Sequence, residues 1–132
     1  MVEQKPKKNL VAIIGGSGIN DMPMFNGQDD AWLTFDTKYK LRFSDGSSTS
    51  GIVHYKLDDV TNPSVVFIPR HGKDEHVRYS PHKTQYAANL IAARMLGANV
   101  VIGISAVGSL NRDYTVGSLV IPHGYDDQTG RD

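Results

Sequence analysis

This sequence has no cysteine, no excess of either charge and no long apolar run. The absence of cysteine excludes disulfide bonds and thiolate metal sites. Lys and Arg together number 14, as do Asp and Glu, so the chain builds no broad positive field that would attract nucleic acid. No apolar segment approaches the ~20 residues that cross a bilayer, and the polar start does not fit a signal peptide. These features predict a cytoplasmic protein without a nucleic-acid or membrane partner.

The 132 residues fit a single domain with a hydrophobic core. Residues 1–9 are polar and are predicted to form a tail. Leu10–Ile14 and Ser64–Ile68 are short continuous apolar runs, which is typical of strands buried on both faces. Residues 31–43 and 52–57 alternate between apolar and polar and are separated by turn-forming residues, so they are predicted to form antiparallel strands.

The clearest helix is predicted to follow the second buried strand. Ser80 is placed to cap it, Pro81 fits its first position and Gly97 its end. One apolar stripe at helical spacing is predicted to face the core; it consists of Tyr86, Leu90, Ala93 and Leu96.

Two further strands are predicted after this helix, at Asn99–Ile104 and Gly117–Ile121. The order of strand, helix and strand implies a right-handed parallel crossover. The expected fold is therefore α/β, with a mixed central sheet flanked by helices. The final segment, residues 123–132, is predicted to be a loop with no closing helix, at a point where such a fold is expected to continue.

Polar loops follow three of the predicted buried strands. Gly15–Gly18 lets the backbone approach an anion and adds the hydroxyl of Ser17. Arg70 offers a planar fork of donors suited to phosphate, and His71 can donate another hydrogen bond. Ser105 follows the third strand. Because parallel strands bring their carboxyl ends to one edge of a sheet, the loops predict a convergent oxyanion site, most plausibly for phosphate.

Other nucleotide and hydrolase motifs fit less well. A dinucleotide-binding fingerprint would need glycine where Asp21 stands, and no lysine follows the glycines at the spacing of a P-loop. Gly103–Gly108 is close to a nucleophile elbow around Ser105, but its second glycine comes one residue late and no helix pattern follows. An esterase therefore stays a minor alternative.

A metal site is also disfavoured. His71, His76 and His82 flank Asp74 and Glu75, yet no pair has the spacing of a zinc-binding helix and no third ligand is evident. We expect no bound metal and a polar loop shaped by its histidines. A general-acid role for Asp126 and Asp127, in the last segment, is also disfavoured, because acidic residues near the end of a loop more often face solvent or cap a helix.

Taken together, the motifs resemble those of methylthioadenosine phosphorylase and related purine nucleoside phosphorylases. Their order and spacing match from about residue 11 to residue 131. In chain order they are Gly15–Gly18, Arg70-His71-Gly72, His76, Pro81, Tyr86, Asn89, Ser105-Ala106 and Gly108-Ser109-Leu110.

The resemblance implies phosphorolysis of a purine nucleoside to a free purine and a pentose 1-phosphate. It implies phosphate contacts from Ser17, Arg70, His71, Ser105 and the backbone of Ala106, with Ser105 and Ala106 also bordering the ribose. It assigns no catalytic residue. Phosphate would be a co-substrate, no cofactor is expected, and the protein would be a homotrimer.

The sequence departs from the family pattern in several places. Ser17 and Ser105 stand where threonine is common, Gln85 replaces an asparagine, and His123-Gly124 replaces an acidic residue and a glutamine. Family members are also roughly twice as long. Residues 10–132 are therefore expected to be the N-terminal part of one nucleoside phosphorylase-like domain, exposing apolar surface. The alternative is a catalytically inactive phosphate-binding module that lacks the purine-binding half.

Overall fold

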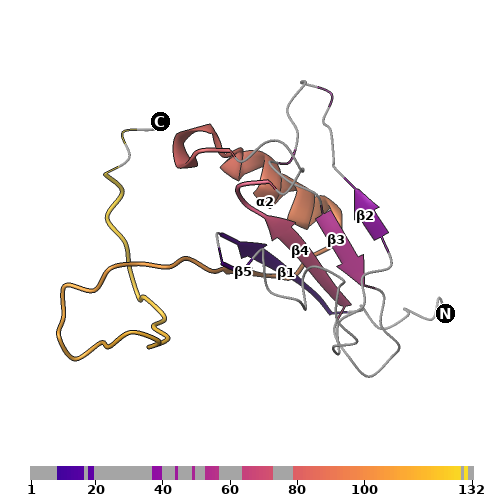
Figure 1. Cartoon of the computed structure of the whole chain (residues 1–132). Coiled ribbons are helices and arrows are strands. Elements are labelled where there is room, and N and C mark those ends of the chain that lie inside the picture. Colours follow the sequence, from indigo (N-terminus) through magenta and orange to yellow (C-terminus); the bar gives the residue numbers. More distant parts are fainter. Residues whose placement is uncertain are drawn as a thin grey trace.

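A computed structural model describes residues 9–16, 18–19, 37–39, 44, 49, 53–56, 64–72, 79–128 and 130. These residues form one sheet and one α-helix (Figure 1). The strands within them follow the order β2-β3-β4-β1-β5 across the sheet. In chain order the elements are β1 (Leu10–Gly15), β2 (Thr37–Tyr39), β3 (Val53–Lys56), β4 (Ser64–Pro69), the 3-10 turn η1 (Pro81–Lys83), α2 (Tyr86–Met95) and β5 (Val100–Gly103).

The predicted mixed sheet is confirmed. β1 pairs in parallel with β4 on one side and β5 on the other, with Ala12 opposite both Val66 and Val101. β3 pairs antiparallel with β4 and with β2. β1 and β4 are continuous apolar runs because each lies between two neighbouring strands and has apolar contacts on both faces. The rest of the two predicted antiparallel strands lies outside the described residues.

Apolar side chains pack on both faces of the parallel strands. On one face, alternate residues of β1 and β4 form the largest core cluster, which α2 joins through the fully buried Ala93. On the opposite face, Phe67 is fully buried against Ile13, Ile19 and Val65. The cluster under α2 contains Leu10, Ala12, Ile14, Val66, Ile68 and Ala93.

The predicted helix start is wrong by several residues. Pro81 opens the short turn η1, Ser80 makes no side-chain capping bond there, and α2 begins only at Tyr86. The two segments are separated because Thr84 has an extended backbone, with φ −65° and ψ 131°. The helix α2 ends as predicted, with Gly97 at φ +91°. The Gly97 amide donates to the Arg94 carbonyl and the Ala98 amide to the Ala93 carbonyl, which is a Schellman motif.

The predicted apolar stripe of α2 is also partly wrong. Tyr86 and Leu90 are 42% and 51% exposed, whereas Ala93 is buried. The buried face instead carries small or polar residues. Its members are Ala88, Asn89, Ala92 and Ala93. No helix within the described ranges is long and apolar enough to cross a membrane.

The chain after β5 runs away from the sheet as an irregular segment (Figure 1). The strand predicted at Gly117–Ile121 is absent, and Leu119 and Ile121 are 98% and 95% exposed. A strand requires a pairing partner, and in the described part of the chain none lies beside this segment. β5 itself is half-exposed at the edge of the sheet.

Candidate functional site

Three loops begin side by side at the carboxyl ends of β1, β4 and β5. The Arg70 amide donates to the Gly15 carbonyl at 2.7 Å, and the Ile104 amide donates to the Ile14 carbonyl at 3.0 Å. Both bonds extend the parallel ladders just beyond β4 and β5. The predicted convergence of the loops at one sheet edge is therefore confirmed.

Arg70 joins two of these loops. Its Nη1 donates to Ser105 Oγ at 2.7 Å and to the Ile104 carbonyl at 3.5 Å. The guanidinium also lies so close to buried Gly16, in the third loop, that a Cβ at this position would overlap it. One planar cation therefore contacts all three loops, and its place depends on the missing side chain at Gly16.

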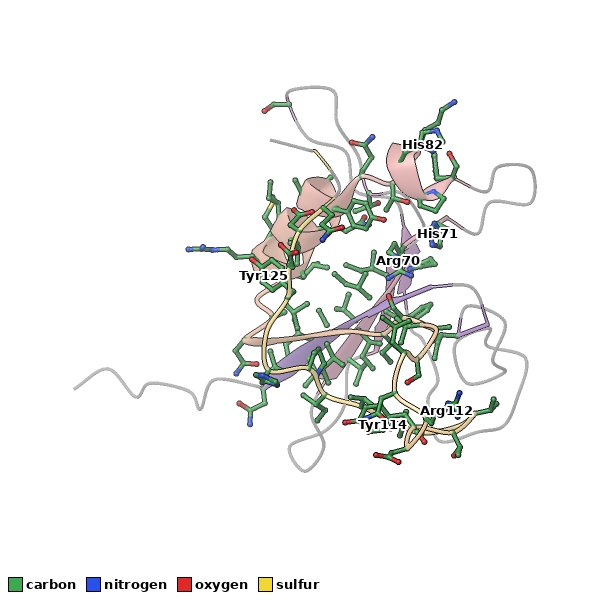
Figure 2. The ribbon with its side chains drawn as sticks, turned by 90° about the vertical axis from the view of Figure 1, so that its left-hand side faces the viewer. Arg70, His71, His82, Arg112, Tyr114 and Tyr125 are labelled. Carbon is green, nitrogen blue, oxygen red and sulfur yellow. The ribbon has the colours of Figure 1, made fainter. Side chains whose placement is uncertain are left out.

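His71 lies beside this guanidinium at the same end of the sheet (Figure 2). Arg70 Nε donates to His71 Nε2 at 3.3 Å. On the other side of the ring, Nδ1 lies 3.0 Å from the Tyr79 carbonyl oxygen and 3.3 Å from Thr84 Oγ1. His71 is thus held between Arg70 and the segment that precedes α2.

The remaining predicted site residues have different placements. Ala106 follows Ser105 in the exposed chain after β5. Ser17 lies outside the described residues, between Gly16 and Gly18, as do His76, Asp74 and Glu75. Where the structure is described, no group of three or more His, Asp or Glu residues could hold a metal.

Thr84 and Tyr79 are the contacts that the sequence did not predict. Thr84 is only 4% exposed although it carries a hydroxyl. Its position gave no signal, because the helix was expected to run through it, whereas the break after η1 turns Thr84 toward His71.

The arrangement favours anion binding over acyl transfer. A guanidinium presents five N–H donors and has no acceptor, so it attracts oxyanions but cannot take a proton from Ser105. Within the described residues, the side-chain hydrogen-bond partner of Ser105 is this cation and not a histidine base. In this part of the chain, Ser105 therefore has no base of the kind that activates an esterase nucleophile.

The fold and the site define an α/β protein in which Arg70 lies beside His71 and Ser105 at the carboxyl edge of the parallel strands. The chain belongs to the phosphorylase superfamily, whose family model matches residues 10–132. This confirms the family resemblance drawn from the motifs.

The relatives of this chain include two kinds of nucleoside phosphorylase. It is 39% identical over 129 residues to the S-methyl-5'-thioadenosine phosphorylase of Saccharolobus solfataricus, covering 98% of this chain and 43% of that protein. It is 35% identical over 123 residues to the purine nucleoside phosphorylase of Streptomyces coelicolor, covering 92% and 38%. The chain thus spans about two fifths of the length of these curated relatives.

Solved structures give the same result for the fold. An adenosine/methylthioadenosine phosphorylase from Schistosoma mansoni superposes with a TM-score of 0.64 at 27% sequence identity. The match covers 82% of this chain and 34% of that one. The nucleoside phosphorylase-like fold class is therefore confirmed.

Proposed function

We propose that this protein takes part in the phosphorolysis of a purine nucleoside, yielding the free purine and a pentose 1-phosphate. The substrate proposed is 5'-methylthioadenosine or a related 6-amino or 6-oxo purine nucleoside. Membership of the phosphorylase superfamily and the names of its relatives support the reaction class. The observation that carries the proposal is the Arg70–Ser105 hydrogen bond across two loops, beside the glycine that makes room for it.

The proposed phosphate site is built around Arg70. Its guanidinium supplies charge and paired donors, and the Ser105 hydroxyl and the Ala106 amide follow β5, on the far side of β1. Ser17 and His71 are proposed as further phosphate contacts. Ser105 and Ala106 would also border the ribose. We propose phosphate as the co-substrate and no other cofactor.

In the proposed reaction, a phosphate oxygen attacks the anomeric carbon while the bond from this carbon to the purine nitrogen breaks. The sugar passes through a state similar to an oxocarbenium ion. A phosphate held in place by Arg70 would lower the barrier in two ways. It would be positioned for attack, and its negative charge would stabilise the developing cation.

The direct test is purine release from methylthioadenosine, methylthioinosine, adenosine and inosine, with and without phosphate. We expect release that depends on phosphate and that arsenate also supports. Arg70→Ala should weaken phosphate binding about ten- to hundred-fold, the effect of losing a charged hydrogen-bond donor. Arg112→Ala is the matched control, because Arg112 is exposed in the segment after β5, away from Arg70 (Figure 2).

The other outcomes separate the alternatives. Phosphate binding without purine release would support an inactive phosphate-binding module. Ester hydrolysis that ignores phosphate, with an acyl adduct on Ser105, would support the esterase. Unchanged phosphate affinity in Arg70→Ala would refute the proposed site.

The family resemblance also leads us to propose a homotrimer, and the sequence features described above lead us to propose a cytoplasmic location. Sedimentation of the purified protein tests its oligomeric state independently of its activity.

A further inference from the structure

We infer that Thr84 is a positioning residue: its buried hydroxyl fixes the tautomer and orientation of His71 and, through His71, the Arg70 guanidinium. The importance of this for phosphate rests on the proposed function. The hydrogen-bond chain itself does not, since it is formed by protein groups alone.

The hydrogen-bond chain begins at Arg70, whose Nε can act only as a donor. Arg70 Nε always carries a hydrogen, so His71 Nε2, at 3.3 Å, must accept from it. A neutral imidazole that accepts at Nε2 carries its hydrogen on Nδ1. The Tyr79 carbonyl oxygen, 3.0 Å from Nδ1, can only accept and therefore requires the same tautomer.

Thr84 adds a second constraint on Nδ1. Its hydroxyl donates to the Ser80 carbonyl at 3.3 Å, which uses its single hydrogen. Thr84 Oγ1 can then only accept from His71 Nδ1, at 3.3 Å. The opposite tautomer would set a nitrogen lone pair against two oxygens, and Thr84 is too buried for water to relieve this readily.

The consequence reaches the candidate anion site. Because Tyr79 and Thr84 hold the His71 ring at Nδ1, its Nε2 lone pair can accept from Arg70 Nε and hold that side of the guanidinium. The Nη side of the same plane is directed to Ser105 and Ile104. Thr84 therefore orients the cation without contacting the anion. The Tyr79 amide, which donates to the His71 carbonyl at 2.8 Å, fastens the same segment to the loop.

The first experiment measures the tautomer in the unmodified protein. Side-chain nitrogen NMR of ¹⁵N-histidine-labelled protein, well above the usual histidine pKa of ~6.5, separates the two ring nitrogens, and a His71→Gln spectrum assigns the signals. We expect the Nδ1–H tautomer at His71. The Nε2–H tautomer would overturn the inference whether or not the protein binds phosphate.

The second experiment compares Thr84→Val with Thr84→Ser. Valine keeps the shape but removes the hydroxyl, whereas serine keeps the hydroxyl. In Thr84→Val the Tyr79 carbonyl still accepts from Nδ1, so we expect the Nε2–H tautomer of His71 to appear beside the Nδ1–H tautomer and not to replace it. Phosphate affinity, measured by calorimetry with inorganic phosphate, should fall about two- to tenfold, as for one neutral hydrogen bond. Thr84→Ser should restore both.

Four outcomes can be distinguished. Thr84→Val with an unchanged tautomer overturns the inference, and so does Thr84→Ser with the tautomer mixture of the valine variant. If Thr84→Val does not fold, the unmodified protein and Thr84→Ser decide the tautomer. If Arg70→Ala leaves phosphate affinity unchanged, the proposed function fails, while the NMR result still decides the role of Thr84.

Discussion

At the residue scale, the candidate site depends on a contact that glycine permits. The Arg70 guanidinium occupies the space where a side chain at position 16 would stand. The backbone of Gly16 does not have a positive φ, so an alanine there would suffer no backbone strain. Glycine is required at this position by the cation above it and not by the turn.

Gly16→Ala should therefore weaken phosphate binding with little loss of stability. The added methyl group meets the far end of a flexible side chain, so the fold accommodates it when the guanidinium moves away. We expect the phosphate Kd to rise about tenfold, as for a lost charge-assisted hydrogen bond. Calorimetric titration with phosphate and thermal unfolding of the same sample measure the two effects.

Gly124→Ala is the control for this substitution, because a Cβ at Gly124 meets nothing within 4 Å. A Gly16→Ala protein that binds phosphate normally would show that the guanidinium position is not needed. A protein that loses binding only because it unfolds would show that Gly16 is a purely structural residue.

At the element scale, α2 packs through small side chains. Ala92 and Ala93 are fully buried, Ala93 within the core cluster of β1 and β4, and Asn89 is also buried. The Schellman motif at Gly97 then turns the chain directly into β5. β4 and β5 lie on either side of β1, and the Arg70 side chain spans this distance to reach Ser105.

Ala93→Leu should destabilise the fold by about 1–3 kcal/mol, because added methylene groups in a filled core force the neighbours apart. Ala87→Leu, on the exposed side of α2, should change the free energy of unfolding by less than about 0.5 kcal/mol. Urea denaturation of both variants tests the comparison. Equal losses of unfolding free energy in the two variants would mean that α2 does not bury the face that carries Ala93.

The sequence predicted the elements whose local pattern matches their environment. β1 and β4 could be predicted because a continuous apolar run ended by glycine or proline is typical of a strand buried on both faces. The buried face of α2 could not be predicted from large apolar residues, because the sheet accepts alanines. The prediction of a strand at Gly117–Ile121 was wrong because a strand forms only beside a pairing partner, which the residues of the segment itself do not specify.

The candidate site shows the same division. Arg70 and Ser105 were predictable because Arg70 directly follows β4 and Ser105 comes two residues after β5, so topology alone brings them to one edge. Thr84 was not, because its contact with His71 depends on the break between η1 and α2. A break of this kind between two helical segments can be predicted from sequence only when strong turn-forming residues mark it.

At the scale of the whole molecule, buried side chains are unevenly distributed among the described residues. The parallel strands carry the core, whereas residues 105–128 are exposed throughout. This segment includes large apolar residues that are almost fully accessible, as was expected from the sequence. They include Leu110, Val116, Leu119, Ile121 and Tyr125.

Hydrogen exchange should follow this division. Amides of β1 and β4 bond in the ladder and should exchange slowest. Peptides from residues 105–128 should exchange at the earliest time points, because their described backbone bonds are local ones such as those of Tyr114 and Ser118. Mass spectrometry of timed samples measures both. Slow exchange at Gly117–Ile121 would contradict the irregular structure and restore the predicted strand.

The strand order also sets how far the Arg70 side chain must reach. Because β1 separates β4 from β5, the Arg70 and Ser105 loops leave the sheet two strand spacings apart, about 9–10 Å. The Arg70 side chain spans this gap, since its Nη1 lies 2.7 Å from Ser105 Oγ. The order of the strands therefore sets the minimum length of a side chain at position 70 that can join the two loops, and a shorter side chain would leave Ser105 without this contact.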